Sequence, residues 1–205
     1  MVQTPTKPET LSLELPRTLK LYVTQEQFEA LAASNRDLQL ERTAQGELIV
    51  NPPTGWESGK RNSRISGELY IWWRNAGEPG EVFDSSTAFI LPNGANRAPD
   101  ASWISQERWD ALTEEQKGTF ANICPDFVVE LRSASDTLKS LQEKMQEYMD
   151  NGAKLGWLIN PKNRTVEVYR VGLEVEILSN PTELSGEEIL PGFVLDLRRV
   201  WGENP

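Results

Sequence analysis

Apolar residues recur with a helical period in three stretches of the chain. The first, residues 24–35, begins with a capping box at Thr24. The second covers residues 57–75 and the third residues 136–151, after which Gly152 stands where a left-handed C-cap belongs. One apolar face per stretch predicts three amphipathic helices. The stripes of the second and third helices are Ile65, Leu69, Trp72 and Trp73, and Leu138, Leu141, Met145, Tyr148 and Met149.

Shorter stretches between these helices either alternate polar and apolar residues or are continuously apolar, as strands are. Residues 38–42 and 47–50 predict a β-hairpin that Pro52-Pro53 ends. Further strands are expected at residues 81–91, 99–104, 127–131, 155–159, 165–171 and 174–178, the last at a sheet edge. Also expected are a short helix from Ser105 to Leu112, a loop at 113–119 and an apolar tail, 195–201, that packs down. Interleaved helices and strands indicate an α/β or α+β fold with a mixed sheet.

Length and composition are those of one soluble domain. The chain has 205 residues, of which 38% are hydrophobic and 25% charged. Residues 1–18 are polar and proline-bearing, which predicts a flexible N-terminal leader before a domain at 19–205. The leader lacks the apolar core of a signal peptide, and no apolar run reaches the roughly 18 residues of a membrane span. We therefore expect a cytoplasmic protein with no membrane association.

The chain contains no histidine and a single cysteine, Cys124. These counts exclude Ser-His-Asp and Cys-His catalysis, an internal disulfide and a CxxC zinc site. We expect Cys124 to be a small buried apolar residue. Acid–base chemistry must then use carboxylates, lysine, tyrosine or a metal-bound water. The net charge of −10 argues weakly against nonspecific nucleic-acid binding but is compatible with a nuclease that binds a divalent metal.

Two acidic residues interrupt apolar strand patterns. Glu130 lies inside the run Phe127-Val128-Val129-Glu130-Leu131, where an unpaired buried carboxylate is costly. It could instead point to solvent or pair with Arg132. Asp100 lies thirty residues earlier and opens another short apolar strand. If the two strands are neighbours, both carboxylates reach the same sheet edge and supply oxygen ligands for Mg²⁺ or Mn²⁺.

Such a metal site needs a nearby cation to hold phosphate or orient water, and two candidates exist. Arg132 is two residues beyond Glu130 and would share its face on a strand, although its pKa is too high for a base. Lys144 lies on the flank of the third helix's apolar face; the alternative is a lysine that extends to solvent and pairs with Glu147. Glu68 lies beside the stripe of the second helix and is either a solvent-facing residue or a further acid of the site.

These residues resemble a bacterial restriction endonuclease family, formerly a domain of unknown function, within the PD-(D/E)XK nuclease superfamily. The segments that carry the resemblance are Gly46-Glu47-Leu48-Ile49-Val50, Leu91-Pro92-Asn93-Gly94, Arg97-Ala98-Pro99-Asp100, Pro125 to Asp136, Leu141 to Tyr148, Asn151-Gly152, Gly156 to Pro161 and Val166 to Arg170. The ordered match spans roughly residues 19–170. It implies a restriction-endonuclease-like core, in which a central mixed sheet is flanked by helices.

The resemblance also implies roles for individual residues. Asp100 and Glu130 would hold the divalent metal, and Glu68 is a candidate for an acid from the first core helix. The superfamily's lysine two residues beyond the glutamate is Arg132 in this chain. Lysine migration to the following helix is known in such nucleases, and Lys144 is the matching residue.

The leading hypothesis is a metal-dependent endonuclease that hydrolyses phosphodiester bonds in DNA. The first alternative is a catalytically inactive nuclease-fold protein that binds nucleic acid or a protein partner, which Arg132 favours. The second is an interaction scaffold. Seven tryptophans are many for 205 residues, but Trp72, Trp73 and Trp157 fall in core patterns, which argues against ligand stacking there. A homodimer is plausible because cleavage of two strands usually needs two sites.

Overall fold

A computed structural model describes residues 19–51, 54–118 and 120–203. The predicted leader at residues 1–18 and the proline pair at 52–53 lie outside the described residues. Within the described ranges, no helix is long and apolar enough to cross a membrane.

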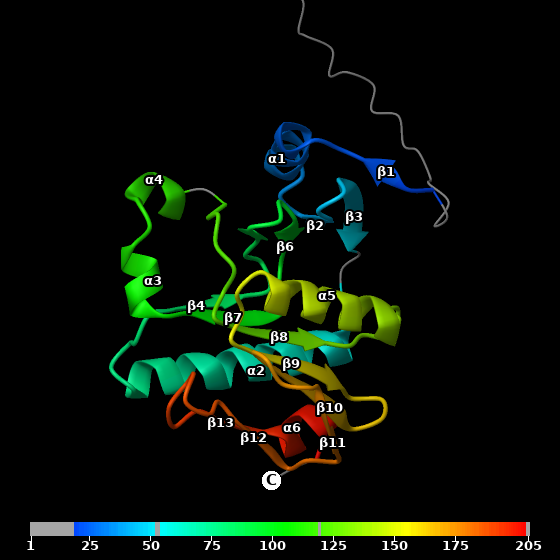
Figure 1. Cartoon of the computed structure of the whole chain (residues 1–205). Helices are drawn as coiled ribbons and strands as arrows, with labels where there is room; N and C mark the ends of the chain where they lie inside the picture. The colour runs from blue at the N-terminus through cyan, green and yellow to red at the C-terminus, as the bar shows by residue number, and fades with distance from the viewer. Residues whose placement is uncertain (1–18, 52–53, 119, 204–205) are drawn as a thin grey trace, which may run out of the picture.

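A six-stranded mixed sheet forms the centre of the fold (Figure 1). Its strands, in spatial order, are β11 (Glu176–Ser179), β10 (Thr165–Arg170), β9 (Leu155–Asn160), β8 (Phe127–Leu131), β7 (Ala101–Ile104) and β4 (Glu81–Asp84). Among these described strands, only β8 and β9 run parallel, and α5 (Leu138–Asp150) connects them, as a parallel pair requires. β8 and β9 are buried along their whole length, which explains their nearly continuous apolar sequence. The predicted edge strand, β11, is at the edge.

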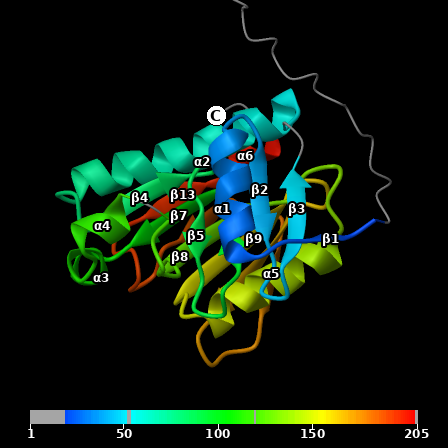
Figure 2. The ribbon, with the colours of Figure 1, turned by 90° about the horizontal axis from the view of Figure 1, so that it is seen from above.

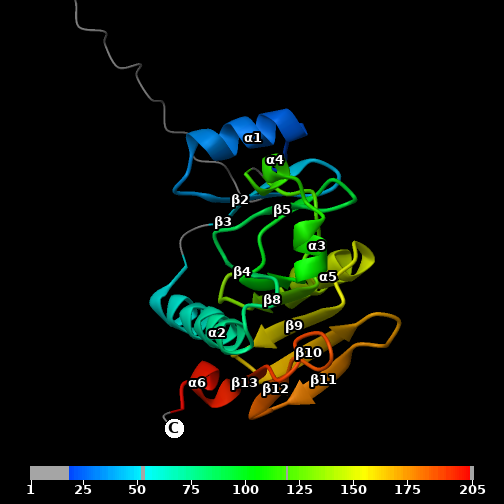
Figure 3. The same cartoon turned by 90° about the vertical axis from the view of Figure 1, so that its left-hand side faces the viewer.

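The helices α5 and α2 (Trp56–Asn75) cover opposite faces of this sheet (Figures 1 and 3). Side chains alternate across β8, so Val128 packs with the apolar stripe of α5 and Val129 with that of α2. The predicted stripes are the buried faces of both helices: Ile65, Leu69 and Trp72 on α2, and Leu141, Met145 and Tyr148 on α5. The expected α+β class with a central mixed sheet flanked by helices is confirmed.

A second, smaller sheet lies above α5 in Figure 1 and is seen from above in Figure 2. Its order is β1 (Leu21–Tyr22), β3 (Glu47–Asn51), β2 (Gln39–Arg42), β6 (Asn96–Arg97) and β5 (Phe89–Ile90), and α1 (Gln25–Ser34) packs beside it. The predicted hairpin is the β2–β3 pair. Between β4 and β7 of the central sheet, the chain passes through β5 and β6, the two-residue strands at one end of this smaller sheet.

The C-terminal segment packs against α2, as the apolar tail predicted. It consists of the hairpin β12 (Glu183–Ser185) and β13 (Val194–Asp196), followed by α6 (Leu197–Trp201). Leu197, Val200 and Trp201 are buried in the same core as Trp72. This segment closes the face of the sheet that lies opposite α5.

Two sequence predictions are wrong in detail. The single strand at 81–91 is broken into β4 and β5, which belong to different sheets. Asp84 Oδ1 accepts hydrogen bonds from the backbone N–H of Ser86 at 3.0 Å and its hydroxyl at 2.6 Å, a local turn that interrupts strand pairing. The loop at 113–119 contains α4 (Glu114–Lys117), because Thr113 forms a capping box with Gln116. The helix expected from Ser105 is α3 (Gln106–Asp110).

Candidate active site

Asp100 and Glu130 lie at the same edge of the central sheet. β7 and β8 are antiparallel neighbours with Ala101 opposite Val129, so the start of β7 meets the end of β8. The backbone N–H of Asp100 donates to the Val129 carbonyl at 2.9 Å. Its carboxylate Oδ2 accepts from the backbone N–H of Leu131 at 2.7 Å. These two bonds fix Asp100 beside Glu130 by extending the ladder between their strands.

Glu130 is 4% exposed and contacts two polar side chains of α5. Lys144 Nζ lies 2.7 Å from Glu130 Oε1, and the Tyr148 hydroxyl donates to the same oxygen at 3.1 Å. Oε2 takes part in neither contact. Lys144 and Tyr148 are one helical turn apart, so both reach the end of β8 from one face of α5. The buried glutamate that the strand pattern indicated therefore has a cationic partner, which is Lys144.

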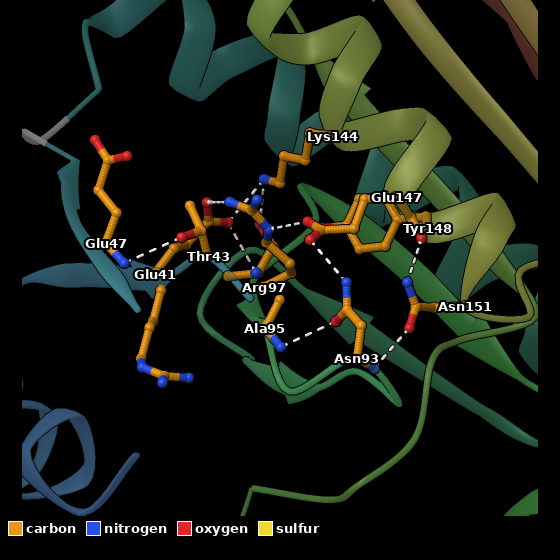
Figure 4. A network of polar contacts seen from close by, with 12 residues as sticks. Glu41, Thr43, Glu47, Asn93, Ala95, Arg97, Lys144, Glu147, Tyr148 and Asn151 are labelled. Atoms are coloured by element: carbon orange, nitrogen blue, oxygen red, sulfur yellow. Dashed lines mark hydrogen bonds and ion pairs between the residues drawn. The ribbon is translucent and has the colours of Figure 1, made fainter. Parts of the chain in front are cut away.

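Glu41, on β2 of the smaller sheet, completes the cluster and was missed by the sequence analysis. It is 3% exposed, and its Oε1 lies 2.7 Å from Lys144 Nζ. The same oxygen accepts from the Ala98 backbone N–H at 2.9 Å. Lys144 thus bridges Glu41 and Glu130, two carboxylates from different sheets. Figure 4 shows Lys144 and Glu41. Glu41 lies in an alternating strand, where a polar residue is expected, whereas Glu130 interrupts a continuously apolar run, so the local pattern did not single out Glu41.

Arg97 holds Glu41 and α5 in place beside the lysine. Its Nε lies 2.5 Å from Glu147 Oε2, and its Nη1 lies 3.4 Å from Glu41 Oε2. Glu147 also accepts from Asn93 Nδ2 at 2.9 Å, as Figure 4 shows. Glu147 therefore pairs with Arg97, while Lys144 pairs with the two other glutamates rather than extending to solvent.

The structure places Arg132 and Glu68 apart from this cluster. β8 ends at Leu131, and the Arg132 guanidinium donates to the Asp136 carbonyl at 3.4 Å, in the loop that leads to α5. Glu68 is half-buried on α2 and does not line the cavity that contains Asp100 and Glu130. The α2 residue that does reach the site is Asn62, whose Nδ2 donates to Asp100 Oδ1 at 2.8 Å.

The cluster opens into a cavity of about 1410 Å³. One wall is the β2–β3 hairpin, and the facing wall is the loop between β8 and α5 together with the first turns of α5. The start of α2 forms a third side. The charged residues of the cluster that line it are Glu41, Arg97, Asp100, Glu130, Lys144 and Glu147. The cavity is large enough to receive several units of a polymer, with Asp100 and Glu130 accessible from it.

Comparison with known proteins identifies the family. The model of the Uma2 family, described as "Putative restriction endonuclease", matches residues 25–198. The chain belongs to the Uma2 family. Among solved structures, the fold matches the crystal structure of a putative nuclease belonging to DUF820 from Anabaena variabilis. That match has a TM-score of 0.67 and 20% sequence identity, and covers 80% of this chain and 89% of the other. No protein with a curated description matches in sequence.

Burial controls the ionisation of the carboxylates in this Uma2 site. Burial, with the nearby charges of Asp100 and Glu41, raises the pKa of Glu130 to about 8 despite Lys144. Burial also raises the pKa of Asp100, although the Leu131 N–H and Lys144 oppose it. Burial acts on Glu41 in the same direction, but Lys144 and Arg97 outweigh it and leave its pKa lowered. Glu41 is therefore favoured as the ionised partner of Lys144, whereas burial favours the protonated form of Glu130.

The two carboxylates suit a hard divalent cation whose remaining ligands come from water and substrate. Among the described residues, no three histidine, cysteine or acidic side chains converge as a metal-ion site. A protein Mg²⁺ site commonly uses only one or two carboxylates, with waters and substrate phosphate as the other ligands. Asp100 and Glu130 meet that requirement, and a cation beside them would favour the ionised form of Glu130. The residues present thus fit Mg²⁺ or Mn²⁺.

Proposed function

We propose that this Uma2 protein is a divalent-metal-dependent endonuclease that hydrolyses phosphodiester bonds in DNA. The observation that carries the proposal is the position of Lys144, 2.7 Å from Glu130, at the sheet edge that also bears Asp100. DNA as the substrate rests on the description of the family. The alternative of an inactive nuclease fold rested on the arginine at position 132. Lys144 weakens that alternative, because it brings a cation to the site that Arg132 does not.

The side chains of the cluster have distinct roles in this proposal. Asp100 and Glu130 would hold Mg²⁺ or Mn²⁺. When bound, such an ion polarises a phosphoryl oxygen and lowers the pKa of a water molecule. Lys144 carries the positive charge that holds a phosphate oxygen and orients the attacking water. Glu41 keeps Lys144 charged and fixes its direction, because burial raises the cost of an unpaired lysine.

Substitution of Asp100 tests the proposal. Asp100→Asn keeps an oxygen that can accept from the Leu131 N–H but removes the charge that a metal needs. We expect it to abolish Mn²⁺ binding in calorimetry and Mn²⁺-dependent cleavage of single-stranded and plasmid DNA, while circular dichroism stays unchanged. Asp110→Asn, on the exposed end of α3, is the matched control and should behave as wild type. Cleavage by Asp100→Asn at the wild-type rate would refute the assignment.

The homodimer, the cytoplasmic location and the extent of the single domain stay predictions. An analytical ultracentrifugation experiment with and without DNA would test the first of them.

A further inference from the structure

An almost fully exposed tryptophan stands at the entrance of the site. Trp56 is the first residue of α2, lines the cavity and is 95% exposed. Among the described residues, the next most exposed large apolar side chain is Val171 at 66%. Trp56 precedes Ile65 of the buried stripe by nine residues, which at about 100° per residue places it on the opposite side of the helix. Trp56 is therefore not an extension of the core.

The two long walls of the cavity carry eight neutral polar side chains beside their charged ones. Amides and hydroxyls line it from the β2–β3 hairpin and from the loop and first turns before Lys144. These residues are Gln39, Thr43, Gln45, Asn51, Ser133, Ser135, Thr137 and Ser140. Such groups both donate and accept hydrogen bonds without charge, which suits the edges of unpaired bases.

The charge of the cavity disfavours a DNA duplex inside it. Eight acidic residues line it, namely Glu41, Glu47, Glu57, Asp100, Glu130, Asp136, Glu143 and Glu147. Its three cations, Lys20, Arg97 and Lys144, each pair with a carboxylate at 2.8, 2.5 and 2.7 Å. A duplex would bring two rows of phosphates against this surface. A single strand can direct its bases to the walls and present one phosphate to Asp100 and Glu130.

We propose that the site takes single-stranded DNA and that Trp56 is the platform on which an unpaired base stacks. The proposal rests on the endonuclease function above and names its substrate class. Stacking on an exposed indole is sequence-tolerant, because every base has an aromatic face. It also covers an apolar surface that the fold leaves in water.

Binding of short oligonucleotides tests this proposal. Fluorescence anisotropy would be measured with a labelled twelve-nucleotide dT strand and with a duplex of equal length, in Ca²⁺ to prevent cleavage. We expect wild type to prefer the single strand. Trp56→Ala should weaken single-strand binding by about 10- to 100-fold, and Trp56→Phe should retain most of it. Tyr70→Ala is the control, since Tyr70 is a half-exposed aromatic residue of the same helix that does not line the cavity.

Three results would overturn the inference: tighter binding of the duplex, equal binding by Trp56→Ala and wild type, or no binding of either DNA by wild type. Because Trp56 is exposed, its substitution should leave the melting temperature unchanged, so weaker binding cannot be attributed to unfolding. If DNA cleavage requires Asp100 but Trp56→Ala binds DNA as tightly as wild type, only the stacking inference is overturned. Nicking that survives in Asp100→Asn would refute the proposed function instead.

Discussion

The buried carboxyl group of Glu130 should make the metal-free protein less stable as the pH rises. Its pKa is raised from 4.5 to about 8 in the folded chain. Between these two values the folded state binds a proton that the unfolded state has released, so stability falls as the pH rises through this window. Glu130→Gln removes the titration but keeps an oxygen that can accept from Lys144 and Tyr148. The variant should therefore lose this part of the pH dependence.

The magnitude follows from the same values. A pKa difference between 4.5 and about 8, at about 1.4 kcal/mol per pH unit, gives an upper limit of about 5 kcal/mol. Because the site borders an open cavity, water reduces the burial cost, and we expect about half of that figure. Glu130→Gln should match wild type at pH 5 and exceed its free energy of unfolding by about 2 kcal/mol at pH 9.

Urea unfolding in EDTA at several pH values between 5 and 9 measures this difference. Identical pH dependence in the two proteins, or a larger gain at pH 5 than at pH 9, would refute the reasoning. Mn²⁺ offers an internal check, because an ion that binds the ionised carboxylate should stabilise wild type and leave Glu130→Gln nearly unchanged. Glu130, which the proposed reaction needs, would then lower the stability of the metal-free protein.

Three further predictions follow from the same structure. Lys144→Met should abolish cleavage. It should also destabilise the fold by about 3 kcal/mol in urea unfolding at pH 8, because Glu41 loses its main cation. Stability equal to wild type would argue against the Lys144 bridge. Glu68→Gln should cleave DNA at a rate within about twofold of wild type, because Glu68 does not line the cavity. Loss of Mn²⁺ binding in this variant would show that Glu68 belongs to the site. Gly80→Ala should cost at least about 3 kcal/mol in thermal unfolding, because a Cβ there would lie 2.0 Å from the Ile104 carbonyl oxygen; Gly77→Ala, also at positive φ but in open space, should cost about 1 kcal/mol.

Local patterns were sufficient for the elements that carry the site. The apolar runs around Asp100 and Glu130 predicted two strands, and the stripe of α5 placed Lys144 at the margin of its buried face. The pairing of β7 with β8 depends on contacts distant in sequence, so the sequence could state it only as a condition. Glu41 was missed for the same reason.

The second sheet was the part of the fold that sequence patterns could not reveal. β5 and β6 contain two residues each, too few to show a period, and their pairing depends on the β2–β3 hairpin. Glu41 reaches Lys144 only because this sheet lies over α5. Arg132 was expected to share the face of Glu130 if it lay on a strand, but the strand ends at Leu131, as predicted, and the chain turns toward Asp136.

Gly156 of β9 determines how closely α5 approaches the sheet. A Cβ at this position would lie 2.5 Å from the Cε of Met145, the residue that follows Lys144. A lysine borne on a strand is positioned by the hydrogen-bond ladder, whereas this lysine is positioned by the volume of the side chains beneath its helix. The reach of Lys144, the proposed catalytic cation, is therefore a property of core packing. Gly156, Met145 and Val128 do not line the cavity. Substitutions there should nevertheless change the cleavage rate, because they alter the packing that positions Lys144.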